Sequence, residues 1–293
     1  MTPFYLVDVF TDRPFSGNPL AIVTEADGLD TELMQRIAGE FNQTETTFVL
    51  HPTLEGATWR LRSFTAVGTE VFGVGHNALG AWWWLAASGR LTLDAPTRTF
   101  AQEIDGRVLP VEIREEQGRL TVSMWQADPV FGAVVGNVSP LASALDLGDA
   151  ELAVGRLKAQ VVSTGVPHLL VPVRDEGALG RARPTETLAA YLRSVGAQGC
   201  YVFSLDPLDP DAPVHARFFG PNVGIAEDPA TGSAAGPLAA YLVEHKLATE
   251  RRPVRIEQGH AMGRPSRIEV RISGGGVRVC GTAVLVLEGR LRH

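Results

Sequence analysis

The stretch Gly75-His-Asn-Ala-Leu-Gly-Ala-Trp-Trp-Trp-Leu-Ala-Ala-Ser88 contains no charged side chain. From Asn77 to Ser88 it is apolar on every side of a helix, so an α-helix formed here has no face for solvent. Its length is closer to that of a buried core helix than to that of a bilayer crossing. The sequence therefore predicts a helix that is surrounded by other parts of the fold.

Short strands are expected on both sides of this helix. Apolar and β-branched runs predict them at 5–10, within 15–23, and at 45–50, 58–63, 97–101, 108–114 and 120–125. A further helix is expected from its N-cap Asp30 to about Asn42, because apolar residues recur there at helical spacing. Glu45 then sits at the turn from that helix into the next strand.

The second half of the chain shows a similar pattern of short strands and helices. Strands are expected at 160–162, 169–173, 199–204, 214–219, 254–257, 267–272 and 282–289, and helices at 186–195 and 233–244. Arg62-Ser-Phe64 is similar to Arg217-Phe-Phe219. Glu70 with Gly75-His76 is similar to Glu227 with Gly232-Ser233, at a constant offset of 157 positions. A repeat of this period predicts two copies of one domain, at 1–128 and 129–293, with a ligand in the cleft between them.

The composition excludes several classes of protein. The 293 residues carry a formal net charge of -7 and no Lys/Arg-rich run, which argues against a nucleic-acid partner. The two cysteines, Cys200 and Cys280, lack metal-site spacing and are expected to be buried. The N-terminus lacks the flanks of a signal peptide, so we expect a soluble cytoplasmic protein without a membrane partner.

Two loop-to-helix junctions have the features that an anionic ligand requires. The first turn of a helix has unpaired N–H groups and partial positive charge. Gly75 and Gly232 allow close approach to the backbone, and Thr231 and Ser233 add hydroxyl donors. Ordinary helix capping is the alternative for each junction alone. No loop has P-loop or GxGxxG spacing in the right context, so no nucleotide cofactor is expected.

Glu45 is the leading candidate for acid/base chemistry. It follows a helix C-terminus, where partial negative charge favours the protonated carboxyl group, and such tuning suits proton transfer near neutral pH. Asp228 and His76 are further candidates. The alternatives are a solvated turn glutamate for Glu45, a capping carboxylate for Asp228 and a buried structural histidine for His76. Glu70 and Glu227 are expected to bond loop amides.

Several motifs, spread along the chain, together resemble those of one family. They are Val7-Asp-Val-Phe-Thr-Asp-Arg-Pro-Phe-Ser-Gly-Asn-Pro-Leu-Ala-Ile-Val23, Phe41-Asn-Gln-Thr-Glu-Thr-Thr-Phe48, Glu70 through Gly75-His76, Asp228-Pro-Ala-Thr-Gly-Ser233, and Gln258-Gly259 followed by Gly263-Arg-Pro-Ser266. In this order they resemble the phenazine-biosynthesis isomerase family, the PhzF-like proteins, over essentially the whole chain.

The resemblance implies the diaminopimelate epimerase-like fold, of mixed α/β (α+β) class. Each of two pseudo-symmetric halves has a curved β-sheet wrapped around a central α-helix, and the last strand, about 282–290, crosses back to the first half. The resemblance also implies a homodimer and no cofactor. Relatives in this fold use a pair of thiols at the two helix N-termini. This chain has none there, so racemisation by two cysteines is not expected.

The family mechanism, carried over to this sequence, gives each candidate residue a role. Glu45 would take a proton from one ring carbon of a small cyclic carboxylate, a dihydro-hydroxyanthranilate, and return it to another. The resemblance implies that His76, Asp228 and Ser233 hold the substrate's polar groups and that the loop amides near Gly75 and Gly232 bind its carboxylate. Asn18 is a further expected contact, and Asn77 and Thr231 are also expected to bind substrate.

The chain departs from the family pattern beside the expected pocket. Ala66 stands where a proline is expected, with an extra residue before Glu70, and Asn77-Ala78 replaces a common threonine. These changes leave the natural substrate and the link to phenazine synthesis open. Two other functions also stay open: an amino-acid racemase or epimerase with bases other than thiols, and a binding protein that has lost the chemistry.

Overall fold

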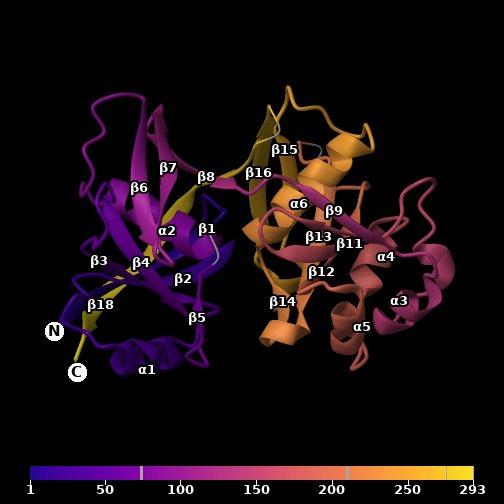
Figure 1. Cartoon of the computed structure of the whole chain (residues 1–293), viewed down its shortest axis with the longest axis horizontal. Coiled ribbons are helices and arrows are strands. Elements are labelled where there is room, and N and C mark those ends of the chain that lie inside the picture. Colours follow the sequence, from indigo (N-terminus) through magenta and orange to yellow (C-terminus); the bar gives the residue numbers. More distant parts are fainter. Residues whose placement is uncertain (73–74, 209–210, 275, 293) are drawn as a thin grey trace. The chain divides into compact units, whose positions relative to one another are not determined.

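The computed structural model describes residues 1–72, 75–208, 211–274 and 276–292, and they form two compact units (Figure 1). Unit 1 comprises Met1–Trp125 and Cys280–His293, and unit 2 comprises Gln126–Val279. Within the described ranges, no helix combines the length and the apolar character that crossing a bilayer requires.

Unit 1 is built around one helix. Its elements are β1 (Thr2–Val9), β2 (Asn18–Val23), α1 (Thr31–Phe41), β3 (Thr46–Leu50), β4 (Trp59–Phe64), β5 (Glu70–Val71), α2 (His76–Ala87), β6 (Thr97–Ile104), β7 (Arg107–Glu116), β8 (Arg119–Gln126) and β18 (Ala283–Leu291). Strands β1, β2, β3, β7 and β18 all contact α2, which lies among them in Figure 1. The apolar helix expected from the sequence is thus enclosed by a sheet.

Close packing holds α2 inside this sheet. A Cβ atom at Gly80 would lie 2.7 Å from side-chain atoms of Leu20 and Val9, so glycine lets β1 and β2 approach the helix. The Trp82 ring is fully buried, and its Nε1 donates to Gln102 Oε1 on β6 at 3.0 Å. The indole therefore fills the core without leaving its N–H unbonded.

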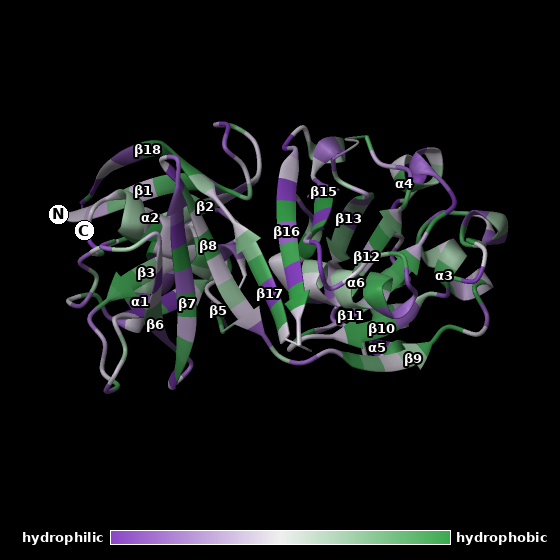
Figure 2. Ribbon diagram, turned by 90° about the horizontal axis from the view of Figure 1, so that it is seen from above, coloured by the Kyte–Doolittle hydropathy of each residue, from purple (hydrophilic) through white to green (hydrophobic). Residues whose placement is uncertain are grey.

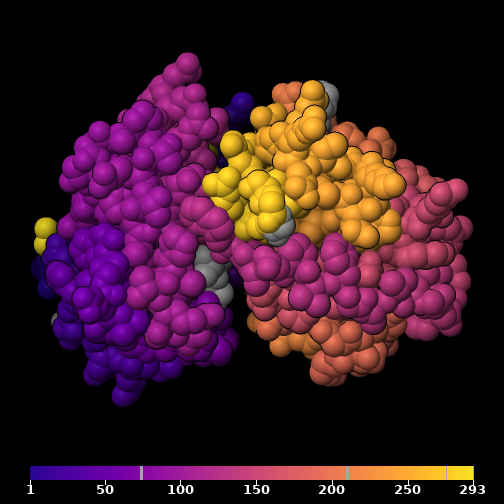
Figure 3. Space-filling model, turned by 45° about the horizontal axis from the view of Figure 1, so that its top comes forward, coloured from indigo at the N-terminus to yellow at the C-terminus, as the bar shows by residue number. Residues whose placement is uncertain are grey.

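The two ends of the chain meet within unit 1. Strand β18 pairs antiparallel with β1, from Thr2 opposite Leu291 to Val9 opposite Ala283. In the space-filling view, yellow C-terminal atoms lie beside indigo N-terminal atoms at one edge of the unit (Figure 3). The last strand of the chain, β18, thus lies in the same sheet as the first strand, β1.

Helix α1 covers the sheet face that points away from α2. Asp30 caps it by accepting a hydrogen bond from the Leu33 amide at 2.8 Å, and Asn42 ends it in a left-handed conformation with a φ of 50°. Met34 and Ile37 of the helix share a core cluster with Phe48 of β3. The helix expected from its cap and apolar spacing is confirmed.

Unit 2 repeats the plan around α6 (Gly232–Glu244). Its remaining elements are β9 (Val130–Val134), α3 (Ser139–Ala144), the 3-10 turn Asp149–Glu151, β10 (Gln160–Ser163), β11 (Pro167–Pro172), α4 (Glu176–Arg181), α5 (Leu188–Val195), β12 (Gly199–Ser204), β13 (Val214–Gly220), the 3-10 turn Pro221–Val223, β14 (Ile225–Asp228), β15 (Val254–Gln258), the 3-10 turn His260–Met262, β16 (Ser266–Ser273) and β17 (Gly276–Gly281). Helix α6 contacts β10, β11 and β16, whereas α3, α4 and α5 share a separate core cluster with the outer sheet face.

Strand β16 shows how the sequence sets the two faces of this sheet. Its buried and accessible residues alternate along the strand, and hydrophobic and hydrophilic bands alternate along its ribbon (Figure 2). Successive side chains of a strand point to opposite faces. One face of β16 therefore packs inside the unit while the other meets solvent.

The strands of the two units pair in the same succession. In unit 1, β1–β2 is antiparallel, β2–β3 parallel, β3–β4 antiparallel and β4–β6 parallel. In unit 2, β10–β11, β11–β12, β12–β13 and β13–β15 follow the same succession. The fold class expected from the sequence, two similar halves each with a sheet around a central helix, is confirmed.

An arginine–glutamate pair recurs at the same place in both units. Arg62 on β4 binds Glu70 through two hydrogen bonds of 2.7 Å, and Arg217 on β13 binds Glu227 through two of 2.8 Å. The sequence similarity of these residues thus reflects a shared interaction. The expectation that both glutamates bond loop amides is wrong, because each is held by an arginine.

Candidate active site

Glu45 and His76 lie together in unit 1. Glu45 directly precedes β3, and His76 is the first residue of α2. Glu45 Oε2 lies 3.8 Å from His76 Nδ1, and the two side chains are 19% and 7% exposed. The turn after α1 and the start of the central helix therefore bring a carboxyl group and an imidazole into one largely buried place.

The His76 imidazole is neutral at neutral pH. Burial disfavours its charged form and lowers its pKa from 6.5 to about 4. Its Nε2 is buried and has no hydrogen-bond partner among the described residues. Although the distance to Glu45 would suit an ion pair, this pKa makes the contact one between a carboxyl group and an uncharged ring.

This assignment predicts how His76 titrates. Because burial lowers the pKa, the ring should stay uncharged as the pH falls from 8 to 5 and protonate only near pH 4. NMR of ¹⁵N-labelled histidine, with His76 assigned from a His76→Asn variant, measures this directly. A His76 resonance that titrates at 6.5 or higher would instead indicate a charged pair with Glu45.

The other predicted residues of unit 1 surround the start of α2. Gly75 is the N-cap of the helix, and its amide donates to Asn77 Oδ1 at 3.0 Å. Asn77 is 2% exposed, and Asn18, the first residue of β2, is fully buried. Asn77 thus braces the glycine turn, in addition to any contact that it makes with a ligand.

In unit 2, a hydrogen-bond network fixes the loop before α6. Thr231 Oγ1 donates to Asp228 Oδ2 at 2.5 Å, and Asp228 is 5% exposed. The Gln258 amide group donates to the Asp228 carbonyl at 2.7 Å and accepts from the Thr231 amide at 3.2 Å. Tyr201 donates to the same Gln258 Oε1 at 2.8 Å. This loop is therefore held by buried side chains from β12 and β15.

The motif from Gln258 to Ser266 supports the same loop. Ser266 Oγ donates to the carbonyl of Pro229 at 2.7 Å. Gly259 has a φ of +84°, and a Cβ atom there would lie 2.3 Å from the Arg264 carbonyl oxygen and 2.7 Å from that of Pro229. Only glycine fits this conformation and spacing. The sequence motif is explained by support of the Asp228 loop.

Gly232 and Ser233 open α6, and at these first two positions a helix offers no backbone acceptor for the N–H groups. The Gly232 carbonyl accepts from Gln126 Nε2 at 3.0 Å, and Thr164 Oγ1 donates to Gln126 Oε1 at 2.7 Å. Ser233 Oγ lies 3.2 Å from Nε2 of His168. These three supporting side chains were not found from the sequence. The Gly-x-Pro pattern shared by 17–19 and 165–167 is the signal that could have drawn attention to the second hairpin.

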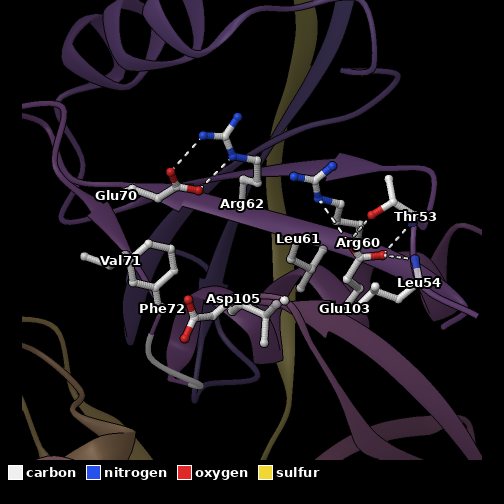
Figure 4. Close-up of a pocket in the computed structure, with 12 residues that line it drawn as sticks. Thr53, Leu54, Arg60, Leu61, Arg62, Glu70, Val71, Phe72, Glu103 and Asp105 are labelled. Carbon is white, nitrogen blue, oxygen red and sulfur yellow. Dashed lines mark hydrogen bonds and ion pairs between the residues drawn. The ribbon is translucent and has the colours of Figure 1, made fainter.

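A groove of about 500 Å³ lies elsewhere in unit 1 (Figure 4). Arg60, Arg62, Glu70 and Glu103 line it, and their charges are already matched, since Arg62 binds Glu70 and Arg60 lies 3.4 Å from Glu103. None of the predicted site residues lines this groove. It therefore offers no support for the chemistry assigned to Glu45.

The remaining reactive groups form no metal site among the described residues, where no cluster of three His, Cys, Asp or Glu side chains suits a cation. Cys200 and Cys280 are both buried thiols. Burial raises the pKa of the Cys200 thiol, and Cys280 Sγ accepts a hydrogen bond from Ser123 at 3.2 Å. Burial of this kind is typical of structural rather than nucleophilic cysteines.

Comparison with known proteins gives a consistent result. The family model for phenazine biosynthesis-like protein matches residues 7–289. An uncharacterized isomerase of Clostridium acetobutylicum is 33% identical over 98% of this chain and 97% of its own, and the trans-2,3-dihydro-3-hydroxyanthranilate isomerase of Pseudomonas aeruginosa is 32% identical over 99% of each. The crystal structure of a Bacillus anthracis phenazine biosynthesis protein of the PhzF family has a TM-score of 0.88 at 30% identity, covering 100% of this chain and 99% of that one. The chain belongs to the phenazine biosynthesis-like family of PhzF proteins, and it is an isomerase.

Proposed function

We propose that this isomerase moves a proton on a small cyclic carboxylate, similar to trans-2,3-dihydro-3-hydroxyanthranilate, and that Glu45 carries the proton. The observation that supports this most is the place of Glu45, largely buried and 3.8 Å from a neutral histidine at the start of α2. The relative from Pseudomonas aeruginosa, named for that substrate, supports the substrate class.

The proposed step needs no redox partner. The Glu45 carboxylate takes a proton from one ring carbon, and the electrons of the broken C–H bond enter the neighbouring unsaturated system. The carboxylic acid so formed returns the proton to another ring carbon, so that substrate and product have the same atoms. One carboxyl group suffices when removal and return occur on the same face, and a positioned acid/base group of this kind contributes about 10²- to 10⁴-fold in rate.

The proposal also assigns roles to the remaining residues. The amide groups around Gly75 and Gly232 bind negative substrate oxygens, as helix N-termini do. The side chains proposed to hold the other polar groups are Asn18, His76, Asn77, Asp228, Thr231 and Ser233. A homodimer, activity without a cofactor, cytoplasmic localisation and a domain boundary between 128 and 129 stay predictions.

Isotope transfer tests the proposed chemistry. Substrate deuterated at the reacting carbon, incubated in ordinary water, is expected to give product that keeps part of its deuterium at the new position, because one carboxyl group carries it there. A two-base racemase would instead exchange the α-hydrogen with solvent and invert that centre. A binding protein would bind the compound, giving a calorimetric signal, and leave its isotope content unchanged. Mass spectrometry and NMR of the recovered compound distinguish these outcomes.

A further inference from the structure

His168 is a buried imidazole without a role in the proposed proton transfer. It is the second residue of β11 and is 2% exposed. Its Nε2 lies 3.2 Å from Oγ of Ser233, the second residue of α6. Its Nδ1 is buried without a hydrogen-bond partner among the described residues. The ring therefore makes its side-chain hydrogen bond with a residue proposed to bind substrate.

The surroundings fix the orientation of this ring. Phe218 packs against it edge to face, with ring centroids 5.2 Å apart and an interplanar angle of 85°. A Cβ atom at Gly199 would lie 3.2 Å from His168 Nδ1 and 2.3 Å from Phe218 Cζ. Glycine thus lets the backbone of β12 close over the imidazole. The imidazole is therefore packed between the Phe218 ring and the β12 backbone.

The equivalent position of unit 1 does not need a polar side chain. Gly17-Asn-Pro19-Leu20 opens β2, and Gly165-Val-Pro167-His168 opens β11 at the same point of the repeated strand order. Leu20 lies against α2, because a Cβ at Gly80 would be 2.7 Å from its Cδ2. An apolar residue therefore satisfies the fold here. A buried histidine with one nitrogen unbonded costs stability, and such local departures are expected at functional sites.

The hydrogen bond between His168 Nε2 and Ser233 Oγ can run in two directions, and only one of them leaves the Ser233 hydroxyl free to donate to an anion. A serine hydroxyl has one proton and can accept as well as donate. If Ser233 donates to Nε2, its proton is used within the protein. If Nε2–H donates to Ser233 Oγ, the hydroxyl proton is free to point at a substrate oxygen, and the two bonds strengthen one another.

We propose that His168 is a positioning residue for Ser233: it donates through Nε2–H to Ser233 Oγ and so directs the serine hydroxyl toward a negatively charged oxygen of the substrate. The inference rests on the proposed function only in taking Ser233 as a substrate-binding residue. Burial lowers the pKa of His168 to about 3 and so keeps the ring uncharged. An uncharged imidazole carries one N–H proton, on either Nδ1 or Nε2.

The tautomer can be measured without any substrate. Long-range ¹H–¹⁵N correlation spectra of ¹⁵N-histidine-labelled protein, with His168 assigned from a His168→Gln variant, distinguish protonated Nε2 from protonated Nδ1. The proposal expects protonated Nε2 at pH 7. Protonated Nδ1 would overturn it and would leave the role of Glu45 untouched, since this readout does not depend on turnover.

Kinetics with trans-2,3-dihydro-3-hydroxyanthranilate test the consequence. His168→Phe and Ser233→Ala are each expected to raise KM about ten- to a hundred-fold, as loss of a hydrogen bond to a charged group does, with a smaller change in kcat. Combining them should raise KM no further than Ser233→Ala alone. His168→Gln, whose amide N–H reaches near the position of Nε2, should restore most of the binding.

A matched control is His215→Phe, which replaces another histidine of unit 2 that is also 2% exposed. His215 Nδ1 lies 2.6 Å from Glu176 Oε2 and is not part of the Ser233 network. Folded His215→Phe should keep the KM of the parent. An unchanged KM in His168→Phe, or effects of His168→Phe and Ser233→Ala that multiply, would show that His168 does not act through Ser233. If His168→Phe fails to fold, the tautomer measurement still decides.

Discussion

Replacement of Glu45 by glutamine is expected to lower kcat by about 10²- to 10⁴-fold, the range that a positioned acid/base group contributes. Glutamine has the same shape but cannot take up and return a proton. The side chain is 19% exposed and lies 3.8 Å from a neutral imidazole, so folding and substrate binding should change little. Initial rates with trans-2,3-dihydro-3-hydroxyanthranilate measure the loss of kcat, and isothermal titration of the variant with the same compound measures binding.

Glu40→Gln provides the matched control. Glu40 lies on the exposed side of α1, five positions earlier, and its replacement removes the same charge. Its kcat should equal that of the parent. Glu45→Asp, which keeps a carboxyl group but draws it back by one methylene, should retain more activity than Glu45→Gln. A Glu45→Gln protein with kcat within twofold of the parent would remove this side chain from the mechanism.

The fold could be predicted to a large extent because its central elements have strong local signals. Helix α2 has no polar face, and α1 has a capping Asp30 with apolar residues at helical spacing. By contrast, β9, α3 and α4 were not predicted. Strand β9 is exposed along its length and α3 and α4 have six residues each. In such short or exposed elements, pairing and packing with distant residues outweigh local propensity.

Proximity within the candidate site could be anticipated only in part, because each motif was recognised separately along the chain. The contact of Glu45 with His76 joins two motifs that the sequence had singled out separately. The support of the Asp228 loop by Tyr201 could not be predicted, because tyrosine on an apolar strand is typical of a core. His168 was missed for the same reason: within Pro167–Pro172 it looks like one polar residue in a buried strand. Only the repeat comparison with Leu20 marks it as unusual.

Replacement of Arg217 by methionine is expected to cost about 3–5 kcal/mol of stability, the usual effect of removing one partner of a buried ion pair. The Arg217 side chain is 4% exposed and binds both carboxylate oxygens of Glu227 at 2.8 Å. Its Nη1 also donates to the carbonyls of Leu179 and Ala182, at 3.0 and 2.8 Å. Methionine fills the space but leaves a carboxylate and these carbonyls without their donor.

Arg62→Met is the matched control that the internal repeat supplies. Arg62 and Glu70 form the same bidentate pair in unit 1, but their side chains are 18% and 26% exposed, so water can replace the lost partner. The expected cost is only about 1 kcal/mol. Urea unfolding followed by circular dichroism should therefore give a clearly lower midpoint for Arg217→Met than for Arg62→Met. Equal midpoints would mean that the shared geometry, and not the burial of the unit 2 pair, determines how much each pair stabilises the fold.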